Sequence, residues 1–332
     1  MNVEPVTKVE KLFEWIDEMA LAIQKHKDIT YLEALAETGE NLLDLEIKQL
    51  LPFEEKKKLE QQLKEEIPKE VQKEDVRKSF QLAVIKGMKE AVQPHHAMTP
   101  DAVALFIGYL AQKLTAQKDT LTVLDPAVGS ANLLSAVLNQ LSQTVVGYGV
   151  EVDETLLHIA YVLSELQEHH VELFHQDSIE ELAVPPVDVV VSDLPIGYYP
   201  KDDVAESFQL KAETNRSYVH YLMIEKTLQH VKDGGFLLLL IPNTMFEMDG
   251  NDRLQKYIKE HAFTLGLLQL PASMFTSEQF GKSIWMLQKK GEGVKQPNQA
   301  LLAELPSFSR YEALLDMTKQ IDKWLKDQGF AK

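Results

Sequence analysis

The sequence predicts an α/β protein with a doubly wound, mostly parallel sheet of seven strands, preceded by a small helical domain. From about residue 95, short apolar runs rich in β-branched residues alternate with segments of helix length. Apolar strands separated by helices are typical of a parallel sheet that is buried on both faces. Only residues 271–282 separate the last two runs, too few for a crossover helix, so the last strand should be antiparallel and lie at one edge.

The apolar runs place the individual strands and helices of this sheet. The seven strands are expected at residues 121–124, 145–150, 171–174, 187–191, 235–241, 264–270 and 283–287. The helices that accompany them are expected at residues 101–114, 131–141, 154–168, 218–231 and 252–261.

The remainder of the chain consists of helices and a linker. Near the N-terminus, Thr7 with Glu10 and Thr30 with Glu33 have the capping-box pattern that begins a helix. Residues 291–306, rich in glycine and proline, read as a linker before a final amphipathic helix that we expect to pack on the core. The predicted domains are therefore a helical N-terminal domain at 1–92, the sheet domain at 93–290, and the linker with its helix at 291–332.

Composition excludes several classes of protein. The 34 lysines and arginines face 51 aspartates and glutamates, a net charge of −17, and only four of the basic residues are arginines. A domain that binds duplex DNA alone usually has a basic surface, so we expect the isolated chain to bind nucleic acid weakly. The absence of cysteine excludes disulfides and thiolate ligands, and no metal site is expected. With no secretory signal and no apolar run near the roughly 20 residues of a membrane span, we expect a cytoplasmic protein that does not contact membranes.

The first candidate site lies where the first predicted strand ends in Asp125. Pro126, Ala127 and Gly129 follow in a tight loop that leads into a helix containing Asn132. Such a loop lets the backbone approach a ligand closely and directs amide groups of the helix N-terminus toward it. An ordinary structural turn accounts for this pattern about equally well, so a second signal is needed.

That second signal is an acidic residue after each of the next two strands. Glu151 follows the loop by about 20 residues, where a carboxylate can accept hydrogen bonds from ribose hydroxyls. Asp153 is an alternative, although a helix N-cap is the commoner role for that position. Asp177 follows the third strand. Together with the adjacent Val152 and Ser178, these acids predict a bound cofactor of the adenosine type.

The segment after the fourth strand resembles a known family. Asp193-Leu194-Pro195-Ile196 is similar to the Asn/Asp-Pro-Pro-aromatic motif of N6-adenine-specific DNA methyltransferases, above all the methylase (M) subunit of type I restriction–modification systems. The resemblance spans about residues 95–290 and implies the Rossmann-like, seven-stranded methyltransferase sheet. The other segments that resemble the family are Thr99-Pro100, 125–130, 234–243 and 270–275.

The resemblance implies S-adenosyl-L-methionine as the cofactor and an exocyclic amine as the methyl acceptor. By position, Asp193 and the carbonyl of Leu194 would accept the amino hydrogens, and Pro195 would rigidify the turn. Pattern and resemblance together predict these cofactor-binding residues: Thr99, Asp125, Pro126, Ala127, Gly129, Asn132, Glu151, Val152, Asp177, Ser178 and Asp193.

Three positions depart from the family pattern. Leu194 replaces the first proline of the motif, and Ile196 replaces the aromatic residue that stacks on the base. Tyr198 or Tyr199 could take over the stacking, with Tyr198 our candidate for the catalytic set, or both tyrosines could simply pack the loop. Ala131 stands where the first loop commonly has glycine, and its small side chain should leave cofactor binding intact.

The expected function is methylation of an adenine amino group in nucleic acid. Only 42 residues follow Lys290, fewer than a target-recognition domain needs, so we expect a protein partner to recognise the target. Two alternatives stay open. The same motif serves methylation of RNA guanine and of protein glutamine, and the departures at Leu194 and Ile196 also suit a cofactor-binding interaction protein that has lost catalysis.

Overall fold

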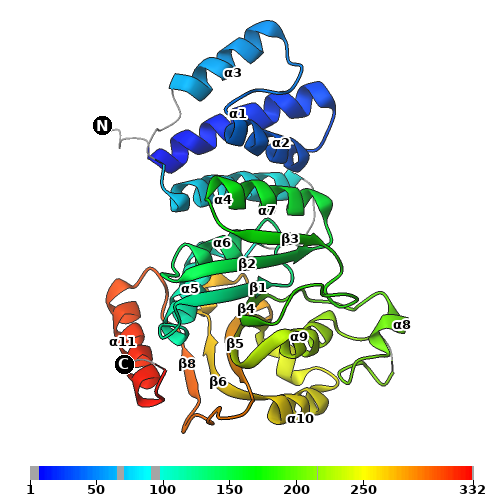
Figure 1. The fold of residues 1–332 in the computed structure, drawn as a ribbon, viewed down its shortest axis with the longest axis vertical. Helices are drawn as coiled ribbons and strands as arrows, with labels where there is room; N and C mark the ends of the chain where they lie inside the picture. Colours follow the sequence, from blue (N-terminus) through cyan, green and yellow to red (C-terminus); the bar gives the residue numbers. More distant parts are fainter. Residues whose placement is uncertain (1–6, 66–70, 91–97, 215, 331–332) are drawn as a thin grey trace.

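The computed structural model describes residues 7–65, 71–90, 98–214 and 216–330, and consists of a helical domain beside an α/β sheet (Figure 1). The predicted boundary between residues 92 and 93 lies outside the described residues. The helical domain contains α1 (Lys8–Lys27), α2 (Tyr31–Asp44), α3 (Phe53–Glu65) and α4 (Lys73–Glu90).

The local sequence explains where α1 and α2 begin. The Thr7 hydroxyl accepts a hydrogen bond from the Glu10 amide (3.2 Å), and the Glu10 carboxylate accepts one from the Thr7 amide (2.7 Å). Thr30 and Glu33 repeat both bonds at the same lengths. The two predicted capping boxes are confirmed, and each satisfies amides that have no partner within the helix.

The core of the helical domain is shared with α7 (Glu154–Leu166) of the sheet domain. Ile16 of α1 and Phe80 of α4 are fully buried in the same cluster as Val162 of α7. Gly39 permits the close approach of α2, because a Cβ there would lie 2.0 Å from Val162 Cγ1. Since α7 also packs on β2 (Thr144–Glu151) and β3 (Val171–His175), it joins the helical domain to the sheet.

Within the described residues the sheet has eight strands in the order β3-β2-β1-β4-β5-β7-β6-β8. All neighbours are parallel except β7, which is antiparallel to β5 and to β6. The predicted α/β class and methyltransferase-type sheet are confirmed. The strands are β1 (Thr120–Asp125), β2 (Thr144–Glu151), β3 (Val171–His175), β4 (Val187–Asp193), β5 (Val231–Pro242), β6 (Ala262–Gln269), β7 (Lys282–Lys289) and β8 (Leu301–Glu304).

Two features of the sheet differ from the prediction. The antiparallel strand β7 lies between β5 and β6 rather than at an edge, and its side chains are buried on both faces, Ile284 on one and Trp285 on the other. The expected linker at 291–306 contains an eighth strand, β8, which pairs parallel with β6. The sequence pattern missed β8 because it has four residues, of which only Leu301 and Ala303 are half-buried.

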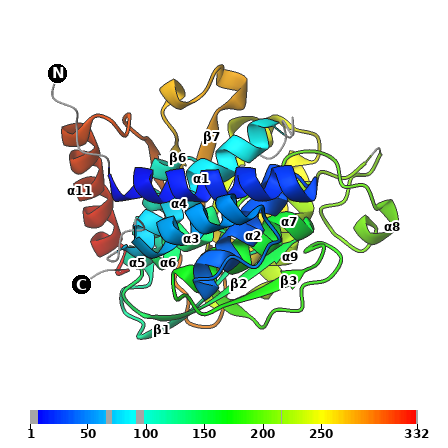
Figure 2. The ribbon, with the colours of Figure 1, turned by 90° about the horizontal axis from the view of Figure 1, so that it is seen from above.

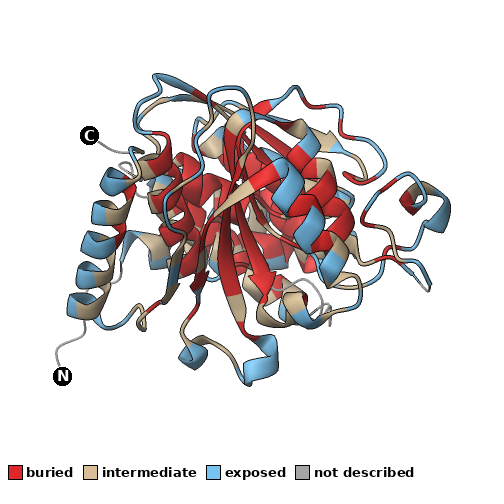
Figure 3. Cartoon of the chain, turned by 90° about the horizontal axis from the view of Figure 1, so that it is seen from below, coloured by how far each residue is buried: buried red, intermediate tan, exposed pale blue. Residues whose placement is uncertain are grey.

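Helices cover both faces of the sheet, whose central strands are buried (Figure 3). The final amphipathic helix packs on the core through Ile321 and Leu325, as expected. No helix in the described ranges has the length and apolar composition needed to cross a bilayer. One face carries α5 (Asp101–Leu114), α6 (Asn132–Leu138) and α11 (Tyr311–Asp327), and the other carries α9 (Val219–His230) and α10 (Asn251–His261).

The remaining short helices lie in connections. The β6–β7 connection, with η2 and η3, projects from the sheet (Figure 2), and Phe280 at its end is 58% exposed. The short helices are α8 (Asp202–Ala205), η1 (Asn243–Glu247), η2 (Ala272–Met274) and η3 (Glu278–Phe280).

Candidate active site

Four acidic side chains gather at one edge of the sheet. Asp125, Glu151 and Asp193 are the last residues of β1, β2 and β4, and Asp177 lies two residues beyond β3. Because β1 lies between β2 and β4, the strand order places these acids along a continuous edge. The carboxyl edge of a parallel sheet is where doubly wound proteins bind their ligands. The structure therefore brings the predicted acids together.

The loop after β1, which we call the Gly129 loop (residues 125–132), has an unusual backbone. Gly129 has a φ of 54° and Ala131 a φ of 62°, both in the left-handed region. Glycine adopts this conformation freely, whereas alanine pays about 1–2 kcal/mol. Ala131 thus stands at a position that favours glycine, and it is fully buried. A Cβ on Gly129 would meet nothing within 4 Å, so the loop faces open space there.

Asp125 is a buried acid within this loop, 1% exposed. Its Oδ1 accepts hydrogen bonds from the Ala127 amide and from Ser192 Oγ, both at 3.1 Å, while no described residue donates to Oδ2. Burial raises the pKa of Asp125 to about 7, and the nearby charges of Asp193 and Glu151 act in the same direction. A cationic or hydrogen-bond-donating ligand at Oδ2 would stabilise the carboxylate.

Glu151 holds the Gly129 loop through both of its carboxylate oxygens. Oε2 accepts a hydrogen bond from the Gly129 amide (2.9 Å), and Oε1 accepts from the amides of Val152 (2.9 Å) and Asp153 (3.0 Å). A ribose hydroxyl would have to use the one lone pair that remains, on Oε2. The alternative acid, Asp153, caps α7 by accepting a hydrogen bond from the Leu156 amide (2.9 Å), as expected.

Asp177 is held by residues from the segment after β4. Its Oδ2 accepts hydrogen bonds from the Tyr199 hydroxyl (2.8 Å) and from Lys201 Nζ (3.3 Å). Ser178 donates a short hydrogen bond to the Pro126 carbonyl, which ties the end of β3 to the Gly129 loop. Val152, by contrast, is 63% exposed at this edge. Burial and the hydrogen bond to Asp177 raise the pKa of the Tyr199 hydroxyl.

Asp193 at the end of β4 lies between two side chains from distant parts of the chain. Its Oδ2 accepts a hydrogen bond from Thr99 Oγ1 (3.0 Å), and its Oδ1 accepts one from Lys282 Nζ (2.5 Å). The carboxylate is 15% exposed. Burial raises the pKa of Asp193, and the charge of Lys282 opposes this shift.

Sequence reasoning did not find Lys282. It is the first residue of β7, and the β5–β7 register pairs it with Pro242, the last residue of β5. Because β7 is antiparallel, its first residue lies at the same edge as the ends of the parallel strands. The sequence does place a lysine at the start of the antiparallel strand. Recognising it as a site residue required knowing that β7 lies beside β5 in the sheet.

The rest of the segment after β4 is divided between core and surface. The Leu194 side chain is buried, and no described residue donates a hydrogen bond to its carbonyl, while Pro195 is exposed. Tyr199 is buried at 3% exposure, whereas Tyr198 is 58% exposed. The ring of Tyr198 stacks on that of Tyr218, with centroids 5.0 Å apart and an interplanar angle of 20°. Of the two tyrosines, only Tyr198 presents its ring at the surface.

Thr99 and Asn132 lie behind the acidic edge. Both side chains are buried, and Asn132 Nδ2 donates a hydrogen bond to the Thr99 carbonyl (3.2 Å). Because the Thr99 hydroxyl binds Asp193, these two predicted cofactor residues connect the Gly129 loop to the end of β4. The hydrogen bonds of both residues are therefore with the protein itself.

The residues at this edge fit the predicted cofactor, S-adenosyl-L-methionine. Asp125 is a buried acid whose Oδ2 has no donor among the described residues, and Glu151 keeps one lone pair, on Oε2, for a hydroxyl group. The open side of Gly129 leaves room above the loop. Several negative charges at one edge also suit a ligand that carries a sulfonium and an ammonium group.

Two protein-family models match this chain. The model of the YtxK N-terminal helical domain matches residues 10–88, and that of N-6 DNA methylase matches residues 89–313. The fold is thus that of the methyltransferases, and the chain belongs to the N-6 DNA methylase family. The resemblance seen in the sequence is confirmed.

Individual relatives share the whole architecture. The uncharacterized protein YtxK of Bacillus subtilis (strain 168) is 48% identical, with 96% of this chain and 98% of that protein covered. A Listeria monocytogenes protein assigned to the class I S-adenosylmethionine-dependent methyltransferases is 39% identical, with a TM-score of 0.87, covering 96% of this chain and 98% of that one. The methyltransferase subunit of a Streptococcus thermophilus type I restriction–modification system shares the fold at 16% identity, with a TM-score of 0.62 and coverage of 94% and 74%.

Proposed function

We propose that this protein uses S-adenosyl-L-methionine to methylate the exocyclic amino group of adenine in nucleic acid. The observation that carries the proposal is the position of Asp193, a partly exposed carboxylate at the end of β4. The neighbouring strand, β1, leads directly into the Gly129 loop. Membership in the N-6 DNA methylase family supports the reaction class. Adenine as the methyl acceptor goes beyond family membership and is part of this proposal.

The cofactor supplies an electrophilic methyl group on a sulfonium sulfur. Asp125 and Glu151 would hold the cofactor through their remaining carboxylate lone pairs, and the open side of Gly129 would leave space for it. Burial of Asp125 strengthens its interaction with a cation, because little water competes at that site.

Asp193 and Leu194 orient the acceptor amine. Each carboxylate oxygen of Asp193 has one protein donor, so each retains a lone pair for an amino hydrogen. The carbonyl of Leu194 accepts the second amino hydrogen. Two acceptors on one amine draw its lone pair out of conjugation with the ring and toward the methyl group. Methyl transfer to the nitrogen would leave S-adenosylhomocysteine as the by-product and displace one amino proton, which Asp193, whose pKa is raised by burial, would accept.

Tyr198 supplies the aromatic surface that Ile196 does not. Its exposed ring lies five residues beyond Asp193 and is fixed by stacking on Tyr218. A base that has left the duplex can stack on such a ring, a contact worth about 1–3 kcal/mol. The fixed ring favours Tyr198 over Tyr199, which is buried against Asp177.

Target recognition requires a partner in this proposal. A net charge of −17 repels phosphates over most of the surface, and affinity for duplex DNA depends mainly on phosphate neutralisation. A protein with a basic surface would supply the missing contacts. The isolated chain should therefore show no duplex binding in about 150 mM salt, and a dissociation constant below about 1 μM would contradict the need for a partner.

A second candidate function is favoured by one contact. The Lys282 ammonium already occupies one oxygen of Asp193, and Leu194 and Ile196 depart from the family motif. A protein that binds the cofactor and acts through interaction, without methyl transfer, would also have these features.

One labelling experiment separates the two candidates. The protein is incubated with S-adenosylmethionine labelled in its methyl group and, separately, with DNA, RNA and cell extract. Label in DNA or RNA that depends on Asp193 supports the proposal, and label in adenine specifies the acceptor. Label in protein would move the acceptor to an amide or amine. Cofactor binding without labelling of any fraction would favour the interaction protein.

A further inference from the structure

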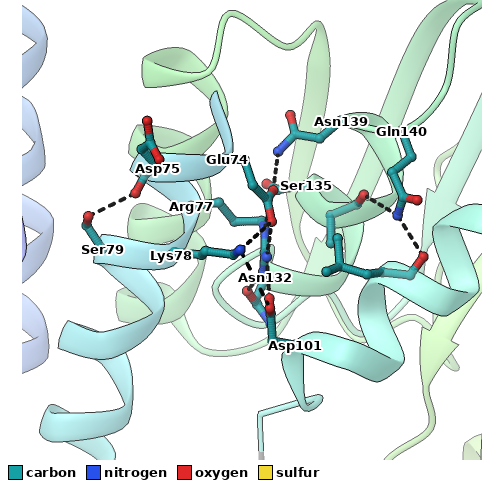
Figure 4. A network of polar contacts seen from close by, with 12 residues as sticks. Glu74, Asp75, Arg77, Lys78, Ser79, Asp101, Asn132, Ser135, Asn139 and Gln140 are labelled. Carbon is teal, nitrogen blue, oxygen red and sulfur yellow. Dashed lines mark hydrogen bonds and ion pairs between the residues drawn. The ribbon is translucent and has the colours of Figure 1, made fainter. Parts of the chain in front are cut away.

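Arg77 of the helical domain reaches the site described above. It lies on α4, and its side chain is fully buried where α4 meets the first residues of α5 and α6 (Figure 4). Its Nε and Nη2 donate to the two carboxylate oxygens of Glu74, at 2.9 and 2.5 Å, and Nη2 also donates a short hydrogen bond to Asp101. Its Nη1 donates to Asn132 Oδ1 at 2.7 Å. The guanidinium thus bridges two acids and one amide.

The contact with Asn132 decides how that amide is oriented. A guanidinium can only donate hydrogen bonds, so Asn132 must turn its oxygen toward Arg77 and its NH₂ group toward the Thr99 carbonyl. The Thr99 hydroxyl then donates to Asp193. A continuous series of hydrogen bonds therefore runs from Arg77 through Asn132 and Thr99 to the carboxylate that receives the acceptor amine.

The same contact lies at the start of α6, where the Gly129 loop ends. Asn132 is the first residue of α6, and Ala131 before it makes no side-chain cap. The Asn132 side chain is 5% exposed, so few other groups compete to hold it. Asn139 at the other end of α6 donates to Glu74 (3.0 Å), which fixes the whole helix against α4.

We propose that Arg77 is a positioning residue of the methyltransferase site: it orients Asn132, and through it the Gly129 loop and Thr99, so that the helical domain is required for productive cofactor binding. The inference rests on the proposed function. It assigns to the N-terminal helical domain a role at the site in addition to its packing on α7.

Lysine cannot replace arginine in this role. Arg77 donates in three directions from one rigid plane, whereas a lysine ammonium is a single point charge on a flexible chain. Arg77→Lys preserves the charge between Glu74 and Asp101, which protects the fold, but it cannot keep the bidentate contact to Glu74 and the contact to Asn132 together. Arg77→Lys is therefore the informative variant.

The test measures binding of S-adenosylhomocysteine to the full chain by calorimetry, with thermal unfolding as a check on the fold. Arg77→Lys should weaken binding at least about tenfold, the loss expected for one oriented charge-assisted hydrogen bond. Ser79→Ala is the matched control, because Ser79 is equally buried on α4 but bonds only to the carbonyls of Val9 and Asp75. This control should stay within about twofold of the wild type.

A double-mutant cycle separates positioning from general destabilisation. In the Asn132→Ala background, Arg77→Lys should have little further effect on binding, because its effect passes through Asn132. Equal losses in both backgrounds, or unchanged binding in a folded Arg77→Lys protein, would overturn the inference. Wild-type protein that binds no cofactor would instead refute the proposed function, so the two failures are distinguishable.

Discussion

The cofactor side and the acceptor side of the sheet edge are built differently. On the cofactor side, Glu151 accepts three backbone amides, two of them from the next two residues of the chain. On the acceptor side, Asp193 accepts hydrogen bonds from Thr99, 94 residues earlier, and from Lys282, 89 residues later. The first arrangement is local and backbone-based, whereas the second depends on three separate elements being correctly placed.

This difference predicts how cofactor binding and methyl transfer should each respond to substitutions at the site. Backbone amides remain wherever the strand and loop form, so the contacts of Glu151 should tolerate side-chain substitutions at Gly129-loop and strand-end positions that supply only an amide. Side-chain partners disappear with a single substitution, so the acceptor side should lose catalysis readily while the cofactor still binds. The predictions below test this contrast.

Asp193→Ala should have the largest effect. Loss of the carboxylate removes an acceptor that acts directly on the amine, so methyl transfer should fall at least about a hundredfold while S-adenosylhomocysteine affinity stays nearly unchanged. Turnover of the labelled substrate and calorimetry measure the two quantities. Asp193→Asn keeps one acceptor oxygen and should retain part of the activity. Wild-type turnover by Asp193→Ala would remove this residue from the mechanism.

Glu151→Ala should weaken cofactor binding by about tenfold or more. The substitution removes the acceptor of the Gly129 amide as well as the predicted ribose contact, and each unpaired polar group costs about 1–3 kcal/mol. Calorimetry with S-adenosylhomocysteine measures the loss. Glu154→Ala, an exposed acid in the first turn of α7, controls for the charge. An unchanged affinity would show that the loop does not depend on Glu151.

Lys282→Met should shift the pH dependence of turnover. Burial raises the pKa of Asp193 and Lys282 opposes that rise, while the Thr99 hydroxyl donates a hydrogen bond to the same carboxylate. Without the lysine charge the pKa of Asp193 rises further. The carboxylate form is the acceptor, so the acid limb of the turnover profile should move to higher pH.

The matched control for this shift is Lys282→Arg. Arginine keeps a positive charge beside Asp193, so its acid limb should stay close to that of the wild type. A pH profile of Lys282→Met that overlaps the wild type would show that Lys282 does not influence the titration of Asp193.

In the cofactor-free chain, Asp125→Asn should have the smallest effect, a change in stability that depends on pH. The pKa of Asp125 is about 7 in the folded chain and 3.8 in its ordinary state, so the folded chain binds more protons between these values. Its contribution to stability is therefore present at low pH and lost as the pH rises through about 7. The Tm of Asp125→Asn minus the Tm of the wild type should therefore be more positive at pH 8 than at pH 5. Asp119→Asn, which replaces an exposed acid, controls for the change of charge. A Tm difference between Asp125→Asn and the wild type that is the same at both pH values would contradict a raised pKa for Asp125.

Most of the fold could be predicted because its signals are local. Strand runs and helix caps depend on neighbouring residues, and the capping boxes at Thr7 and Thr30 formed as expected. The position of β7 and the existence of β8 could not be read in the same way. A strand's neighbours in a sheet depend on distant pairing, and β8 buries too little of its surface to produce an apolar run.

The site divides in the same way. The acids that end β1, β2 and β4 were visible because each follows an apolar run directly. Arg77 and Lys282 were not visible, because each reaches the site through a contact with a residue far away in the sequence. Neither lies within a motif that its local sequence could reveal. The choice between Tyr198 and Tyr199 likewise required knowing which ring is buried.

The core shared between α7 and the helical domain has a consequence for how the protein is made. A chain emerges from the ribosome with its N-terminus first, so α1 to α4 are complete once Glu90 has emerged. Part of the apolar surface of α2 is covered only when Val162 of α7 has emerged, and Arg77 gains its contact with Asn132 at an earlier point, once that residue has emerged. A nascent chain that pauses between these points should hold four helices with an incomplete core. Its exposed apolar surface would be a natural binding site for chaperones during that interval.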